Sequence, residues 1–158
     1  MNIEVASALA TGATELAAFD NALLAAGVGN FNLIYLSSVI PPGSTINRVE
    51  KASVQGGWGD RLYCVMAQHR TSIAGQGVWA GIGWVQEPTF GQGLFAESHG
   101  HSEAEVVSDL HLTLDEMAST RRDWQWDAPR LHVIGGSCES KPVCALVVAT
   151  YESDSWKL

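Results

Sequence analysis

The chain has 158 residues, enough for one domain with a buried core; 46% of them are hydrophobic and only 16% are charged. The formal net charge of −8, without a cluster of Lys and Arg, argues against a nucleic-acid partner, because phosphate contacts need grouped basic side chains. Neither a secretion signal nor a run of membrane-spanning length occurs, so we expect a cytoplasmic protein without a membrane partner. The low density of charge also favours an oligomer.

The N-terminal part predicts a strand followed by a helix. Residues 3–8 alternate loosely and indicate a first strand. Thr14 is a suitable N-cap for a helix that runs to about Ala26, and Gly27 is a suitable stop. This stretch therefore predicts an amphipathic helix between two turns.

An acidic residue interrupts the apolar side of this helix. The residues at helical spacing that we expect to face the core are Leu16, Phe19, Leu23 and Ala26. Asp20 points between Leu16 and Leu24, inside the apolar arc. Two interpretations remain: Asp20 reaches solvent at the edge of the arc, or its carboxylate is kept to meet a cation.

A pair of serines ends the next apolar run. Residues 32–39 are β-like and are broken by Pro41-Pro42, with Ser37-Ser38 near the end. The hydroxyl of Ser38 could attack the carbonyl of Ser37 and form an ester. β-Elimination and hydrolysis would then leave a pyruvoyl group at position 38, an electrophile that forms a Schiff base with an amine. The alternative is an ordinary polar strand end that leads into a turn.

The remaining segments complete a mixed fold. We expect further strands at residues 62–67, 78–85, 94–97, 131–134 and 143–151. Gly81 and Gly83 in the second of these suggest a close backbone approach or a bulge. A capping box at Ser102 and Glu105 opens a second helix, whose last turn we expect to contain Arg121 and Arg122. Two helices among six or seven strands predict one α+β domain of sheets covered by helices.

Metal and disulfide chemistry have weak support. His99-x-His101 with His111 could suggest a metal site, but Gly100 and the helix start favour a turn there, and we expect no metal. The three cysteines form no CxxC pair, so we expect reduced thiols in the core: Cys64, Cys138 and Cys144.

Taken together, the chain resembles the pyruvoyl-dependent arginine decarboxylases over nearly its whole length. The matching segments are Phe19-Asp20, the stretch from Ala25 to Asn30, Asn32-Leu33, Ser37-Ser38-Val39-Ile40-Pro41, Val65-Met66-Ala67 and the stretch from Gly93 to Gly100. The most specific feature is the order Asp…Gly-x-x-Asn…Ser-Ser…Glu. The resemblance implies a sandwich of sheets and helices, assembled as a trimer or a dimer of trimers with active sites between subunits.

The resemblance also implies a role for each matching residue. Residues 1–158 would form one domain that splits into a β chain, 1–37, and an α chain, 38–158. Ser38 would become the pyruvoyl group, and Ser37 the new C-terminus. Glu97 would donate a proton from a poorly solvated site that raises its pKa, and Asn32 would orient the pyruvoyl and substrate groups. The residues implied in substrate binding are Asp20 for the guanidinium, with Leu23, Gly29, Phe31 and Val39 lining the pocket.

The implied reaction is decarboxylation of L-arginine to agmatine and CO2, with the covalent pyruvoyl group in place of a metal or pyridoxal phosphate. It would serve polyamine synthesis or acid tolerance. Two alternatives stay open. One is a pyruvoyl decarboxylase for another amino acid, which Asp20 opposes because its carboxylate would stay unpaired. The other is an uncleaved, non-catalytic paralogue that acts as a regulatory or assembly subunit.

Overall fold

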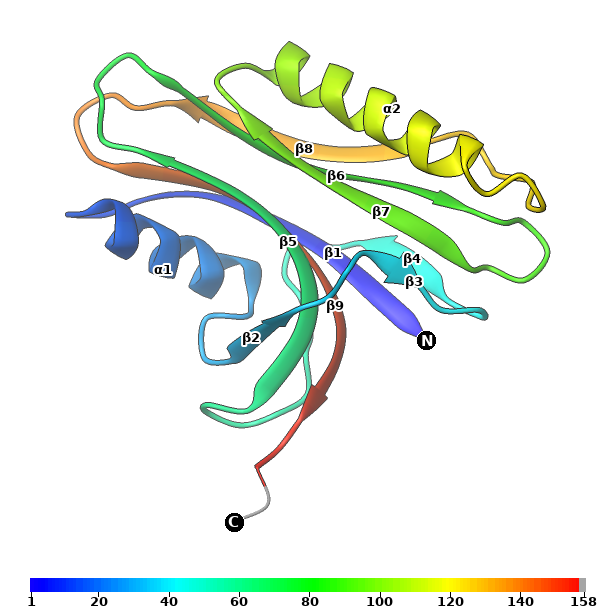
Figure 1. The fold of residues 1–158 in the computed structure, drawn as a ribbon. Coiled ribbons are helices and arrows are strands. Elements are labelled where there is room, and N and C mark those ends of the chain that lie inside the picture. Colours follow the sequence, from blue (N-terminus) through cyan, green and yellow to red (C-terminus); the bar gives the residue numbers. More distant parts are fainter. Residues whose placement is uncertain (157–158) are drawn as a thin grey trace.

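A computed structural model describes residues 1–156 and shows a single α+β domain of four layers (Figure 1). A five-stranded and a four-stranded sheet stack face to face, and each carries one helix on its outer surface. The predicted class, an α+β domain of sheets covered by helices, is confirmed. Within the described residues, neither helix combines the length and the apolar character needed to cross a bilayer.

The first sheet has the strand order β2-β5-β9-β1-β4. Its strands are β1 (Asn2–Thr11), β2 (Asn32–Tyr35), β4 (Thr45–Arg48), β5 (Arg61–Thr71) and β9 (Val143–Asp154). The three long strands pair antiparallel, so that Val5 and Val65 both lie opposite Ala149 of the central strand. The short strands β2 and β4 add in parallel at the two edges. The first eight residues of β9 are buried and the first seven are apolar, as expected of a strand covered on both faces.

The second sheet has the order β3-β7-β6-β8 and is antiparallel throughout. Its strands are β3 (Val39–Ile40), β6 (Gly77–Gln86), β7 (Gly93–Gly100) and β8 (Arg130–Ser137). The edge strand β3 pairs only with Gly93 and Leu94, so the rest of β7 is not covered by a neighbouring strand on that side. Glu97 of β7 lies opposite Ile82 of β6, beyond the part that β3 covers.

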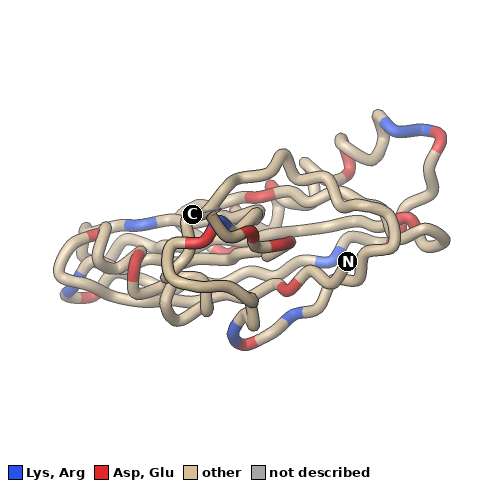
Figure 2. The backbone as a smooth tube through the Cα atoms, turned by 90° about the horizontal axis from the view of Figure 1, so that it is seen from below, with Lys and Arg blue, Asp and Glu red and all other residues tan. Residues whose placement is uncertain are grey.

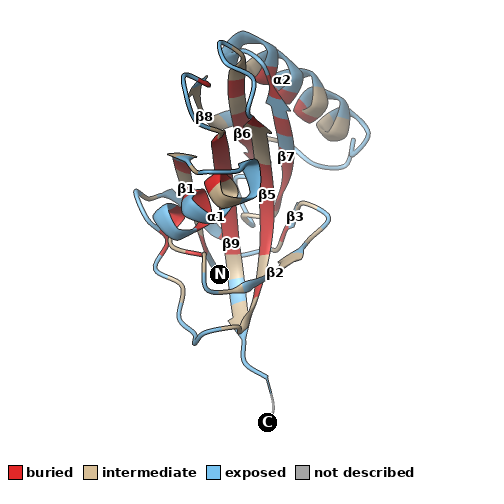
Figure 3. Ribbon diagram, turned by 90° about the vertical axis from the view of Figure 1, so that its left-hand side faces the viewer, coloured by how far each residue is buried: buried red, intermediate tan, exposed pale blue. Residues whose placement is uncertain are grey.

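Three apolar layers hold the domain together. The largest lies between the sheets, and the two others lie beneath the helices; Figure 3 shows the buried residues concentrated along the middle of the strands. Representative members are Val65, Ile82 and Phe95 between the sheets, Ala18, Ala22 and Leu146 beneath α1, and Val106, Leu110 and Leu114 beneath α2. Burial of these apolar side chains is the main stabilising contribution.

Helix α1 (Glu15–Ala26) begins and ends as predicted. The hydroxyl of Thr14 accepts a hydrogen bond from the Ala17 amide, and Gly27 adopts a left-handed conformation with φ 91°. The predicted buried face is wrong in part, because the face against the sheet consists of Ala18, Ala22, Leu23 and Ala26. Leu16 is 67% exposed and Leu24 45% exposed. The alanines let the helix lie close to β1 and β9, which leaves no room beneath it for larger side chains.

Helix α2 (Glu103–Ser119) packs directly on two glycines of β6. A Cβ atom at Gly81 would lie 2.9 Å from Val106, and one at Gly83 would lie 2.8 Å from Leu114. The glycines therefore serve a close approach and not a bulge. The prediction that Arg121 and Arg122 belong to the last turn is wrong, because the helix ends at Ser119. The Arg121 guanidinium still donates to the Met117 carbonyl at 2.8 Å.

The expected strand over residues 32–39 is right only in part, since β2 ends at Tyr35 and the chain changes sheets before Val39. Pairing with β5 stops at Tyr35, and the chain crosses to the second sheet, where β3 pairs with β7. β4 was not predicted. Over residues 1–156, the positions of the acidic and basic residues are spread along the backbone (Figure 2).

Candidate active site

Ser37 and Ser38 lie in the connection that carries the chain from the first sheet to the second. Ser38 has φ 67° and is the one non-glycine residue with a positive φ among residues 1–156. This left-handed conformation is unfavourable for an L-residue by about 1–2 kcal/mol, because Cβ approaches the carbonyl oxygen. The peptide bond between Ser37 and Ser38, the predicted cleavage site, therefore precedes a strained residue. Backbone strain of this kind is often found at functional sites.

The side chain of Ser38 is directed at Glu97. Its hydroxyl donates a short hydrogen bond to the Glu97 carboxylate, across 59 positions of the chain. The backbone is fixed as well, since the Phe95 amide donates to the Ser38 carbonyl at 2.8 Å. The structure thus brings two of the three predicted catalytic residues together, next to the predicted cleavage site.

Glu97 differs from expectation in its surroundings. We expected a poorly solvated site, but Glu97 is exposed in this chain. Tyr151 of β9, in the first sheet, lies close enough for the charge of Glu97 to act on it. Burial is the main cause that raises the pKa of the Tyr151 phenol, and the negative charge of Glu97 raises it further. Nothing in the sequence marks Tyr151, which lies at the end of an ordinary apolar strand.

Asp20 does not reach this pair within one chain. It is exposed on α1, which packs on β1, β9 and β5 from the side opposite the second sheet. One helical turn away on either side lie the exposed side chains of Leu16 and Leu24. Of the two interpretations of Asp20, exposure is observed, but its neighbours on the helix surface are apolar.

Asn32 is also held away from Ser38. Its side-chain amide donates to the Gly59 carbonyl at 2.6 Å, and its backbone amide donates to the Asp60 carbonyl at 2.8 Å. The two positions are separated by six residues of mostly extended chain, a span of up to about 20 Å. In a single chain, Asn32 therefore supports the loop before β5 and makes no hydrogen bond to Ser38 or Glu97 among the described residues.

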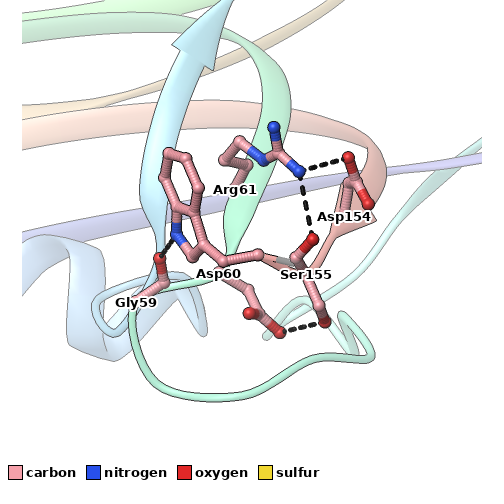
Figure 4. Close-up of polar contacts among 6 residues, drawn as sticks. Gly59, Asp60, Arg61, Asp154 and Ser155 are labelled. Carbon is pink, nitrogen blue, oxygen red and sulfur yellow. Dashed lines mark hydrogen bonds and ion pairs between the residues drawn. The ribbon is translucent and has the colours of Figure 1, made fainter. Parts of the chain in front are cut away.

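The loop that holds Asn32 is clamped to the end of β9 (Figure 4). Arg61 donates to Asp154 at 2.5 Å and to the Ser155 carbonyl at 3.0 Å. Ser155 in turn donates to Asp60 at 2.8 Å, and Trp156 donates to the Gly59 carbonyl at 2.9 Å. The clamp fixes the carbonyl to which the Asn32 amide donates, so the orientation of Asn32 depends on the C-terminal strand.

The four residues predicted to line the substrate pocket are also divided. Leu23 is buried beneath α1, and the predicted pocket residues Gly29 and Phe31 pack on Leu24 and Gly56, respectively. Val39 alone adjoins Ser38, and its side chain is exposed. It lines a largely apolar groove of about 260 Å³ with Pro41, Pro42, Trp124 and Trp126. The sequence-predicted residues therefore fall into two groups on the surface of one chain.

The histidines and cysteines lie outside these groups. The ring of His69 lies 5.4 Å from that of His99 and 4.9 Å from that of His101, while His111 lies apart on exposed α2. Within residues 1–156, no three His, Cys, Asp or Glu side chains are arranged to enclose an ion. All three cysteines are free and buried, as predicted.

Comparisons with known proteins agree with the family resemblance that the sequence motifs indicate. Residues 2–155 match the family described as pyruvoyl-dependent arginine decarboxylase. A protein of that name from Halobacterium salinarum is 35% identical over 140 residues, which cover 87% of this chain and 86% of the relative. A relative from Thermococcus kodakarensis with the same name is 31% identical over 145 residues, covering 91% of this chain and 90% of the relative.

Proposed function

Because this chain belongs to the pyruvoyl-dependent arginine decarboxylase family, we propose that it cuts itself before Ser38 and converts L-arginine to agmatine and CO2. It is an enzyme of the carboxy-lyase class. The observation that carries the proposal is the hydrogen bond from the Ser38 hydroxyl to the Glu97 carboxylate, at the one strained non-glycine residue described.

The contact suits the first step of self-cleavage. Glu97 accepts the hydroxyl proton while the Ser38 oxygen forms a bond to the Ser37 carbonyl carbon, and the amide bond between the two residues breaks. Loss of the α-proton of residue 38 then releases Ser37 as a free carboxylate. Addition of water and loss of ammonia leave a ketone at position 38. The products are residues 1–37 and residues 38–158.

Relief of the backbone strain at Ser38 also favours cleavage. The cost of positive φ arises from the Cβ of an L-residue, and elimination makes the α-carbon of residue 38 planar. Cleavage also removes the peptide bond that defines this torsion. The backbone therefore relaxes as the reaction proceeds, which contributes about 1–2 kcal/mol at the position where the bond breaks.

The residues around position 38 also fit the finished group. A pyruvoyl group supplies a ketone that condenses with the substrate amine and accepts the electrons released on decarboxylation. Glu97 lies within hydrogen-bonding reach of atoms on residue 38, so it is placed to hold a proton for the substrate α-carbon. The reaction consumes one proton per arginine, which would serve acid tolerance. Its product, agmatine, would serve polyamine synthesis in the cytoplasm.

We assign the guanidinium to Asp20 of a neighbouring copy. Leu16 and Leu24 are exposed on either side of Asp20, and a second copy that covered α1 would bury these apolar side chains and turn the carboxylate into a dry site that a guanidinium could pair. Such an assembly, a trimer or a dimer of trimers, would also shield Glu97, which is exposed in a single chain. Shared sites would explain why the predicted residues form two separate groups.

Two experiments test the proposal. First, purified protein is incubated with arginine, histidine or aspartate, and agmatine or the corresponding amine is measured; borohydride is added to trap the amine on residue 38. We expect product and trapping with arginine only. Trapping of histidine or aspartate would show that this amino acid, and not arginine, is the substrate. The absence of any trapping would contradict the pyruvoyl chemistry.

Second, Ser38→Ala and Asp20→Asn chains are co-expressed. Ser38→Ala alone should lack activity and Asp20→Asn alone should use arginine poorly, while mixed assemblies should regain part of the activity, because one interface would combine an intact Ser38 with an intact Asp20. Mixed assemblies that are verified by mass and remain inactive would contradict shared sites. Recovery would not depend on which form of oligomer is adopted.

A further inference from the structure

Tyr151 connects the first sheet to the segment that follows the cleavage site. Its hydroxyl donates to the Val39 carbonyl at 3.1 Å, across 112 positions of the chain. Its ring packs edge-on against Phe95, with the centroids 6.1 Å apart. Phe95 belongs to β7, the strand that carries Glu97. Tyr151 therefore contacts both elements that meet at Ser38.

β3 is held from both sides at this point. On one side, the amide of Phe95 donates to the Ser38 carbonyl at 2.8 Å. On the other side, the next carbonyl along the chain, that of Val39, receives the Tyr151 hydroxyl. A strand of two residues has few ladder hydrogen bonds, and cleavage would turn it into a chain terminus, where fraying is the rule. Each remaining bond then matters for the position of residue 38.

The hydroxyl of Tyr151 stays a hydrogen-bond donor over a wide range of pH. Burial, the Glu97 charge and Cys64 all raise the pKa of this phenol, so it stays protonated well beyond neutral pH. A neutral phenol can donate to a carbonyl oxygen, whereas a phenolate can only accept.

We propose that Tyr151 is a positioning residue, which holds Val39 and thereby keeps the group at position 38 beside Glu97 after cleavage. This inference rests on the proposed function. Tyr151 acts through the backbone, because its described hydrogen bond goes to the Val39 carbonyl and not to the side chain of Asp20 or Glu97. Its loss should therefore lower the rate of turnover more than the affinity for arginine.

The first test replaces Tyr151 with Phe, which keeps the ring and its contact with Phe95. Cleavage is measured by intact mass, the new carbonyl by reaction with phenylhydrazine, and mobility by hydrogen exchange of the peptide that begins at residue 38. We expect cleavage to proceed and exchange to accelerate. Per carbonyl group, kcat should fall roughly three- to tenfold while KM stays within twofold, the scale of one neutral hydrogen bond.

Tyr63→Phe is the matched control, since Tyr63 belongs to neighbouring β5 and none of the hydrogen bonds described involves its hydroxyl. Tyr63→Phe should leave cleavage, carbonyl content, hydrogen exchange, kcat and KM unchanged. If Tyr151→Phe exchanges and turns over like the wild type, the inference is wrong although the proposed function stands. If the wild type itself carries no carbonyl at position 38, the proposed function fails first.

A second measurement does not depend on removing the hydroxyl. A fluorinated tyrosine at position 151 has the same shape but ionises at lower pH. We expect kcat to decline at a lower pH than in the wild type, with KM unaffected, because the phenolate cannot donate to Val39. An unchanged pH profile in a fully cleaved protein would overturn the inference, and so would an equal change with fluorotyrosine at Tyr63.

Discussion

The hydroxyl of Ser38 donates to the carboxylate of Glu97, and this bond joins the crossing between the two sheets to strand β7. Because β3 pairs only with Gly93 and Leu94, the pair lies at an open edge of the sandwich. The same carboxylate can therefore serve the cut and, once residue 38 is a ketone, the substrate that reaches it from outside the chain.

Glu97→Gln should slow both processes. The amide cannot take the Ser38 proton or deliver one to the substrate, so cleavage and turnover should each fall by about 100-fold or more, the scale of lost general acid–base catalysis. Cleavage is timed by gel or mass, and turnover is expressed per cleaved chain. Glu152→Gln, an exposed carboxylate on β9, is the control and should change neither. Normal cleavage would exclude Glu97 from the cut, and normal turnover would exclude it as the proton donor.

The strain at Ser38 can be measured in chains that cannot cleave. Ser38→Gly and Ser38→Ala both remove the nucleophile, but only glycine adopts φ 67° without a Cβ penalty. The free energy of unfolding of Ser38→Gly should exceed that of Ser38→Ala by about 1 kcal/mol, since the penalty outweighs the extra entropy of glycine in the unfolded chain. Equal denaturant midpoints, or a more stable alanine variant, would show that the backbone at this position is not strained.

Asp20→Asn should weaken arginine binding without blocking cleavage. Removing one side of a charge pair that is desolvated between copies costs about 2–5 kcal/mol, so kcat/KM should fall at least about 30-fold. Asp109→Asn, on exposed α2, is the control and should have no effect. If Asp20→Asn cleaves and uses arginine normally, another group must bind the guanidinium.

Two histidines should make stability depend on pH. Burial is the main cause that lowers the pKa of both His69 and His132 below the ordinary value of 6.5. Nearby His101 and His99 lower the pKa of His69 further, and Arg48 lowers that of His132. The unfolded chain therefore binds protons more readily than the folded chain, so stability that is present above about pH 6.5 is lost as the pH falls.

Denaturant unfolding at a series of pH values measures this loss. Replacing His69 and His132 with Gln should flatten the profile just below pH 6.5. Replacing His111, which is exposed on α2, should leave the slope as it is. A double variant with the slope of the wild type would mean that other groups control the pH dependence.

Local signals predicted much of the fold. Thr14 and Gly27 set the ends of α1, and Ser102 with Glu105 set the start of α2, because capping depends on neighbouring residues. The paired glycines of β6 suggested a close approach or a bulge, and the structure shows the close approach. The crossing near Ser38 was missed because residues 32–39 are uniformly β-like, and pairing with two different sheets is decided by tertiary contacts.

The candidate site was predicted in part for the same reason. The serine pair is visible in the sequence, but the contact of Ser38 with Glu97 spans 59 positions, and no local pattern points to it. Tyr151 could not be found at all, since its role depends on the stacking of two sheets. The exposed side of α1 was predicted wrongly, because Leu16 fits a helical apolar face, yet it is the alanines that pack against the sheet.

The central claim is that the chain cuts itself between Ser37 and Ser38. Denaturing intact-mass spectrometry of freshly purified protein tests it most directly. Our account predicts two fragments, residues 1–37 and residues 38–158, with the larger fragment lacking an N-terminal amine; Ser38→Ala should stay intact. A wild-type chain that remains in one piece after prolonged incubation would contradict the account, and the roles of Ser38 and Glu97 would be withdrawn with it.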